Sequence, residues 1–165
     1  MKPFFSALVM LGALLICVHF NAQGQTTPPK LSTRLVVAKN QARPGELIMA
    51  SLIVDIPSGY HLNAHDPVSR FALPTKIEVL LPEGYRVGTI SYPRAIVRKF
   101  SFTTERLGVY EKQAVIRFSL RIPPNEQQRT TTVKTVLNYQ SCSDQVCFPP
   151  NKQEATAVFK VGRRT

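Results

Sequence analysis

The stretch AVIRFSLRI, residues 114–122, decides the fold class. From Ile116 onwards its apolar residues occupy every second position, and charged or polar residues stand between them. Residues two apart on a β-strand point to the same face, so this alternation predicts a half-buried strand. The predicted buried face consists of Ile116, Phe118, Leu120 and Ile122.

The same alternation recurs on both sides of this stretch. Four further segments show it, and residues that favour turns separate them. They are ELIMASLIVDI (46–56), TKIEVLL (75–81), TTVKTVLNY (131–139) and ATAVFKV (155–161). No segment of ten or more residues shows a strong helical period of apolar residues. Several short strands without a helix predict an all-β protein, most simply an immunoglobulin-like β-sandwich.

One segment fits this pattern poorly. In RAIVRKFSFTTERLG, residues 94–108, the apolar residues lie irregularly among charged ones. We expect a long loop that covers another part of the molecule, and a plain connection between two strands is the alternative.

The N-terminus predicts export. Lys2 precedes an almost unbroken apolar run that ends at Phe20, and small residues follow. This is the pattern of a secretory signal peptide, which we place over residues 1–24. An uncleaved membrane anchor is one alternative. Lipid attachment at Cys17 is another, although no small residue precedes that cysteine.

The rest of the chain is expected to form one domain. Residues 25–31 are interpreted as a flexible lead-in, and residues 32–165 as the folded domain. The protein is therefore expected to be periplasmic or otherwise exported. Two cysteines remain after the signal, an even number that suits an oxidising compartment.

The formal net charge of the 165-residue chain is +11. The basic residues are spread along the sequence, and no run of alternating basic and aromatic residues develops. We therefore do not expect nucleic-acid binding. A solvated basic surface, with possible contact to an anionic membrane surface, is the simpler interpretation.

The segment NYQSCSDQVCFPPNK, residues 138–152, holds the candidate site. If residues 143–146 form a hairpin loop, Cys142 and Cys147 face each other closely enough for a disulfide. Closing so short a loop stabilises a fold by only about 2 kcal/mol, so a short-range, exposed pair is a weak staple. A redox-active pair and a structural disulfide in a binding or scaffold module both remain open. Asp144 would disfavour a thiolate.

Other chemistry has little support. His61, His65 and Asp66 stand close together, but their spacing is not a recognised zinc pattern. We expect neither a metal nor another cofactor.

The residues around the cysteines resemble a known family. NYQSCSDQVCFPP is similar to the Tyr-Gln-x-Cys…Cys-x-Pro-Pro signature of the N-terminal periplasmic domain of DsbD, a thiol:disulfide interchange protein. PSGYHLNA (57–64) and the segment 92–122 add support, so the likeness covers roughly residues 32–161.

The resemblance implies an immunoglobulin-like domain that relays electrons through a cysteine pair. The donor would be thioredoxin-like, and the acceptors would be periplasmic proteins that carry disulfides. The resemblance therefore favours thiol:disulfide interchange as the activity of a relay component. No membrane or thioredoxin-like domain follows Thr165, so we expect the donor, a thioredoxin-like or a membrane protein, to be another chain.

The resemblance also implies roles for individual residues. Cys142 and Cys147 would be the redox pair, and Cys147 would meet partners. Phe102, or else Phe100, would belong to a cap loop and would shield the pair from solvent. The remaining residues expected to line the site are Tyr139, Asp144, Phe148 and His61. Arg98 and Lys99 depart from the family pattern, since its best-known member has acidic residues there.

Overall fold

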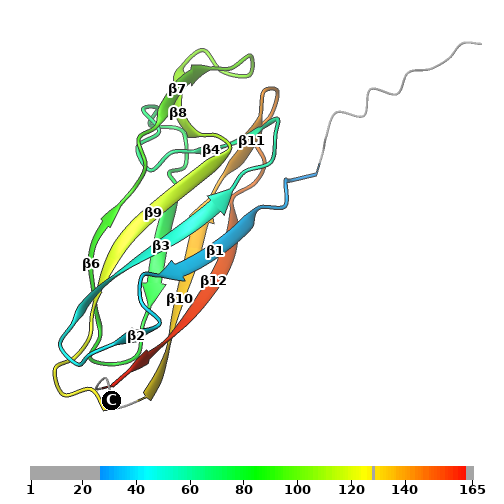
Figure 1. Ribbon diagram of the computed structural model, residues 1–165. Helices are drawn as coiled ribbons and strands as arrows, with labels where there is room; N and C mark the ends of the chain where they lie inside the picture. Colours follow the sequence, from blue (N-terminus) through cyan, green and yellow to red (C-terminus); the bar gives the residue numbers. More distant parts are fainter. Residues whose placement is uncertain (1–26, 128, 163–165) are drawn as a thin grey trace, which may run out of the picture.

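The computed structural model describes residues 27–127 and 129–162 (Figure 1). All regular elements in this part of the chain are β-strands. In chain order they are β1 (Ser32–Val37), β2 (Gln41–Ala42), β3 (Leu47–Asp55), β4 (Tyr60–Asn63), β5 (Lys76–Leu80), β6 (Arg86–Ser91), β7 (Ile96–Lys99), β8 (Arg106–Tyr110), β9 (Gln113–Arg121), β10 (Arg129–Tyr139), β11 (Ser141–Ser143) and β12 (Asn151–Val161).

Two four-stranded sheets form the body of the molecule. The first has the strand order β1-β3-β9-β6, and the second has the order β2-β12-β10-β5. Neighbouring strands are antiparallel, except that β12 and β2 are parallel. The fold is therefore an immunoglobulin-like β-sandwich, as the alternating sequence predicted.

The core lies between these sheets, and alternation decides which residues enter it. In β9 and just after it, Ile116, Phe118, Leu120 and Ile122 have no exposed surface. The inward-facing residues of the other strands join them, among them Leu52, Val54, Val133, Leu137 and Phe159. The predicted buried face of residues 114–122 is thus confirmed. Burial of such side chains contributes roughly 1.5–3 kcal/mol each.

A third sheet, with the order β11-β4-β8-β7, stands at one end of the sandwich. In Figure 1 it lies at the top of the molecule, and the end of β12 lies at the bottom. β4 belongs to both regions, because Leu62 packs into the main core while its neighbours in the strand point the other way. The third sheet positions the candidate site.

The expectation of a long loop over residues 94–108 was wrong. The chain instead forms a hairpin in which β7 pairs with β8, with Ile96 opposite Val109. The residues of β7 are all exposed, and four consecutive residues of β8 are buried, so neither strand shows alternation. Only the turn between them, residues 100–105, is a loop. We call residues 96–110 the cap hairpin.

The cap hairpin has a small core of its own. Phe100, Leu107 and Val109 are buried together, and Ala72 and Phe102 pack against them. This cluster is separate from the main core between the two large sheets. Because it is small, opening it costs less than unfolding the sandwich.

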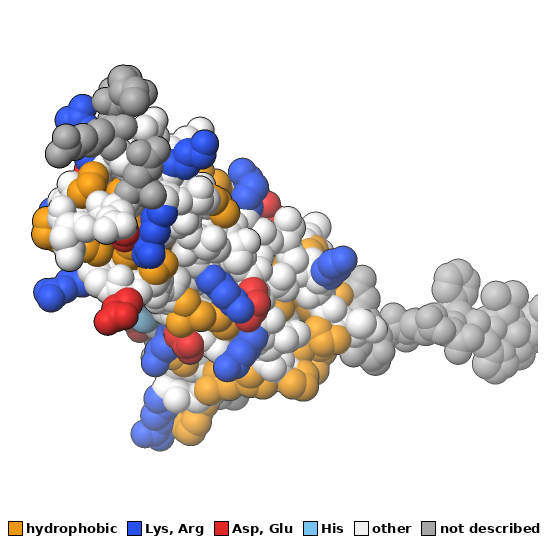
Figure 2. Space-filling model, turned by 90° about the horizontal axis from the view of Figure 1, so that it is seen from below, with side chains coloured by type: hydrophobic (Ala, Val, Ile, Leu, Met, Phe, Trp, Pro, Cys, Tyr) orange, Lys and Arg blue, Asp and Glu red, His pale blue; other side chains and the backbone are white. Residues whose placement is uncertain are grey.

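The first described residues are packed as well. Leu31, within the expected lead-in, is buried in the main core. The predicted signal peptide (1–24), with Cys17, lies outside the described residues. Within the described ranges, no helix has the length and apolarity needed to span a membrane. Figure 2 shows the end remote from the third sheet, where Lys and Arg side chains are dispersed among acidic and apolar ones.

Candidate functional site

A disulfide joins Cys142 to Cys147, as the hairpin geometry predicted. The two residues form an antiparallel bridge, with their Cα atoms 3.9 Å apart. The loop between them is held by its own hydrogen bonds. The backbone N–H of Ser143 donates to the carbonyl of Val146 at 2.8 Å, and the Ser143 hydroxyl accepts from the N–H of Val146.

The two cysteines differ in burial. Cys142 is fully buried, whereas Cys147 is partly exposed. The expectation of an exposed pair is therefore wrong for Cys142. The reason is that Cys142 belongs to β11 and is flanked on both sides, by β4 and by Cys147. Cys147 is thus the more accessible residue of the pair.

The register places a histidine next to the disulfide. His61 of β4 is directly opposite Cys142. Directly opposed side chains project from the same face of a sheet, so His61, Cys142 and Cys147 form one row. The His61 side chain is buried, and its ring stacks on Phe100 at 4.1 Å between centroids.

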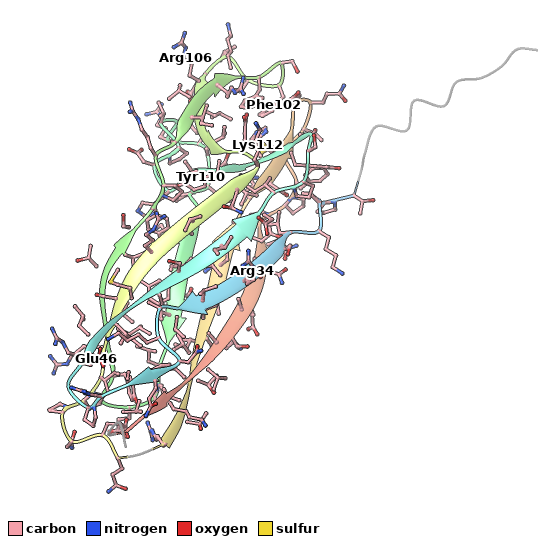
Figure 3. All side chains as sticks on the ribbon, in the orientation of Figure 1. Arg34, Glu46, Phe102, Arg106, Tyr110 and Lys112 are labelled. Carbon is pink, nitrogen blue, oxygen red and sulfur yellow. A yellow bond between two sulfur atoms is a disulfide. The ribbon has the colours of Figure 1, made fainter. Side chains whose placement is uncertain are left out.

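The cap hairpin covers this row. Phe100 lies on His61, and Phe102 stacks on Phe100 at 5.4 Å. The Ser101 hydroxyl donates a hydrogen bond to the backbone carbonyl of Asp144 at 2.8 Å, which ties the cap to the disulfide loop. Figure 3 shows Phe102 at the end of the molecule that carries the third sheet. Phe100 is therefore placed on His61, and Phe102 lines the same groove as Cys147.

A hydrogen-bond network fixes the backbone beside Cys147. The Asn63 side-chain amide donates to the Gln140 side-chain oxygen at 3.0 Å. The Gln140 amide in turn donates to the Phe148 carbonyl at 3.0 Å, and the Phe148 N–H donates to the Ser141 carbonyl at 2.9 Å. These bonds hold the strand that leaves the disulfide against β4.

A groove of about 350 Å³ opens beside Cys147. Phe102 and Leu107 of the cap hairpin line it, and Phe71 and Ala72 of the neighbouring loop complete its apolar wall. Phe71 is 73% exposed, and the guanidinium of Arg70 lies 4.9 Å from the centre of its ring. The other residues that line the groove, apart from Cys147, are polar, so a partner that reaches Cys147 would meet apolar and polar side chains together.

The electrostatics of the row are set by burial and by three charges. Burial lowers the pKa of His61, as does the positive charge of Arg98, while Asp144 and Glu111 act in the opposite direction. Arg98 and Glu111 also form an ion pair at 2.9 Å. Because burial is the largest influence, the imidazole of His61 is neutral at neutral pH.

Two predicted residues lie at the margin of the site. Tyr139 is buried in the main core, where burial raises the pKa of its hydroxyl. Phe148 follows the disulfide directly, and its ring lies 6.0 Å from that of Tyr60. The sequence did not single out Gln140, Ser101 or Phe71. Their roles come from contacts between distant segments, which the local pattern does not contain.

The site is thus a disulfide on a hairpin at one end of a β-sandwich, with one cysteine buried and the other partly exposed. The family described as "Thiol:disulfide interchange protein DsbD, N-terminal" matches residues 32–158, and the chain belongs to this family. No curated protein sequence matches the chain significantly.

Solved structures agree on the fold. The N-terminal periplasmic domain of ScsB from Proteus mirabilis superposes with a TM-score of 0.52 and 13% identity, over 76% of this chain and 45% of that one. The complex between the DsbD N-terminal and PilB N-terminal domains from Neisseria meningitidis gives a TM-score of 0.50 and 21% identity, over 83% of this chain and 88% of that one. These similarities show the fold alone.

Proposed function

We propose that this domain is an exported electron relay between a thioredoxin-like donor and proteins that carry disulfides. The observation that carries the proposal is the asymmetry of the disulfide. Cys147 is partly exposed and lines the groove, while Cys142 is fully buried. A structural disulfide has no need of a groove at one sulfur only.

The chemistry is two successive exchanges. A donor thiolate attacks Cys147 Sγ, the Cys142–Cys147 bond breaks, and Cys142 leaves as a thiolate that takes up a proton. A second donor thiolate then attacks the donor's own sulfur in the mixed disulfide and releases Cys147. Two electrons have entered the domain, which now holds a thiol at Cys142 and a thiolate at Cys147. The same steps in reverse, starting from the Cys147 thiolate, reduce an acceptor disulfide.

The family supports a periplasmic location and a thioredoxin-like or membrane-bound donor. The DsbD N-terminal domain of Neisseria meningitidis forms a complex with the PilB N-terminal domain. By analogy we propose that a protein partner docks over the groove and displaces the tip of the cap hairpin. Cys142, Cys147, Phe100 and Phe102 are the residues proposed to act, with His61, Asp144 and Phe148 around them.

Trapping experiments test the proposal. The Cys142→Ser variant is incubated with an oxidised thioredoxin-like protein, and we expect a mixed disulfide through Cys147 that mass spectrometry detects. The Cys147→Ser variant is the matched control and is expected to form little adduct, because Cys142 is buried. Equal trapping by both variants would contradict the assigned order.

The reduction state of the wild-type domain provides a second test. We expect a reduced thioredoxin-like protein to convert the Cys142–Cys147 disulfide to two thiols. A disulfide that stays oxidised, with a reduction potential below about −300 mV, would instead indicate a structural bond in a binding or scaffold module.

A further inference from the structure

A buried histidine stands beside the redox pair, and the exchange steps above leave it without a role. His61 is opposite Cys142 in the strand register, and Cys142 is opposite Cys147 on its other side. Opposed Cβ atoms on antiparallel strands are about 4.5–5.5 Å apart. The side chains of His61 and Cys142 therefore project side by side from the same face.

The ring of His61 is held in place but lacks a partner at one atom. Only 2% of the residue is exposed, and Phe100 covers the ring. Within the described part of the chain, Nε2 is buried and has no hydrogen-bond partner while the disulfide is intact. Buried polar atoms in folded proteins are normally paired. Reduction creates a new donor in this row, the thiol hydrogen of Cys142.

We propose that His61 accepts the thiol proton of Cys142 when Cys142 attacks the mixed disulfide at Cys147. This inference rests on the proposed relay function and assigns one of its steps. The proton moves from Cys142 Sγ to Nε2, the Cys142 thiolate attacks Cys147 Sγ, and the acceptor's thiolate leaves. The imidazolium then gives the proton to that thiolate through solvent. The acceptor gains two electrons, and the domain's disulfide is restored.

The electrostatics support this role. Burial lowers the pKa of His61, and the positive charge of Arg98 lowers it further. The negative charges of Asp144 and Glu111 raise it, but the net shift of the pKa is downward. The ring is therefore neutral near pH 7 and has a lone pair free to take a proton. A buried thiol is otherwise a poor nucleophile, because burial disfavours its thiolate.

The two halves of the reaction can be observed separately. Reduced domain is mixed with excess dithiobis(nitrobenzoate), a disulfide that releases a coloured thiolate. Attack by Cys147 releases the first thiolate at a rate that depends on reagent concentration. Attack by Cys142 releases the second at a rate that does not. The Cys142→Ser variant should release only the first, which assigns the phases.

The decisive variant is His61→Phe, which keeps a ring against Phe100 and removes the proton acceptor. We expect its concentration-independent phase to slow by about tenfold or more and to lose its pH inflection, because general-base assistance is absent. The first phase should stay unchanged. His61→Gln, which retains a polar side chain, serves as the second variant if the first does not fold. His65→Gln is the control, since His65 is exposed and stacks on Tyr92.

An unchanged second phase with the same pH profile in His61→Phe and His61→Gln would overturn the assignment of His61. Reduction of the wild-type domain by a thioredoxin-like protein, measured in parallel, separates the two proposals. If that reduction occurs, only the role of His61 has failed. If it does not occur, the relay function itself has failed.

Discussion

The hydroxyl of Ser101 donates a hydrogen bond to the carbonyl oxygen of Asp144, 2.8 Å away. The bond joins the tip of the cap hairpin to the loop that closes the disulfide, across 43 positions of sequence. Among the hydrogen bonds of the described residues, this is the side-chain bond that joins the cap hairpin to the loop between the two cysteines. Its strength therefore influences how often the cap opens.

Replacing Ser101 with Ala should make the cap open more often. One net hydrogen bond is worth roughly 0.5–1.5 kcal/mol, which corresponds to about two- to tenfold faster alkylation of reduced Cys142, the buried cysteine of the pair. The rate is measured with iodoacetamide by mass spectrometry. Thr132→Ala, at an exposed position on β10, is the control and should leave the rate unchanged. Equal rates in wild type and Ser101→Ala would show that this bond does not restrain the cap.

Phe102→Ala should expose the redox pair without weakening the sandwich. The side chain packs on the small cap cluster and lines the groove with Cys147. We expect faster alkylation of the reduced pair and a midpoint of urea unfolding close to that of the wild type, because the main core is untouched. Phe100→Ala should have a larger effect on alkylation, since Phe100 lies directly on His61. A rate unaltered by both replacements would rule out a shield.

Removing the disulfide should have a small effect on stability. The bond closes a loop with a sequence separation of 5. For so short a loop the chain-entropy contribution is about 2 kcal/mol, so Cys142→Ser combined with Cys147→Ser should lower the free energy of unfolding by about that amount. Urea unfolding of the two forms gives the difference. Complete loss of folding would show that the fold depends on this disulfide.

Acid should destabilise the domain partly through His61. Burial lowers the pKa of His61 in the folded chain, whereas the pKa of this histidine in the unfolded chain is about 6.5. As the pH falls below that value, the unfolded chain binds a proton that the folded chain does not, so stability is lost. His61→Phe should therefore lose less stability than wild type between pH 7 and pH 5 in urea titrations. Glu46, whose pKa is lowered by Lys39, contributes equally to both proteins.

Gly108→Ala should disturb the loop that carries Phe71. A Cβ at this position would lie 2.7 Å from the carbonyl oxygen of Asp66 and 3.2 Å from the Cβ of Ala95. Backbone on one side leaves little room to adjust, so we expect a loss of about 1–3 kcal/mol in unfolding free energy. Calorimetry checks the prediction. An unaltered melting temperature would mean that the loop shifts freely.

The sandwich could be predicted from the sequence because its strands have one buried and one exposed face. Residues such as Phe118 and Leu137 then reveal their burial by position alone. The cap hairpin could not be predicted, because its strands show no alternation: β7 is exposed throughout, and the last four residues of β8 are all buried. The cysteine pair itself could be predicted, from the residues that flank it and from a family resemblance. The burial of Cys142 depends on β4, some 80 residues earlier, and no local pattern records it.

The separation of the cap cluster from the main core has a consequence for how such domains diverge. Substitutions in residues 100–105 would alter the surface that we propose a partner meets, yet they would leave the interior of the sandwich intact. Natural variation can therefore accumulate at the tip without loss of the scaffold. Recognition of a new partner would then require substitutions only in this turn, while the strands keep the two sulfur atoms in place.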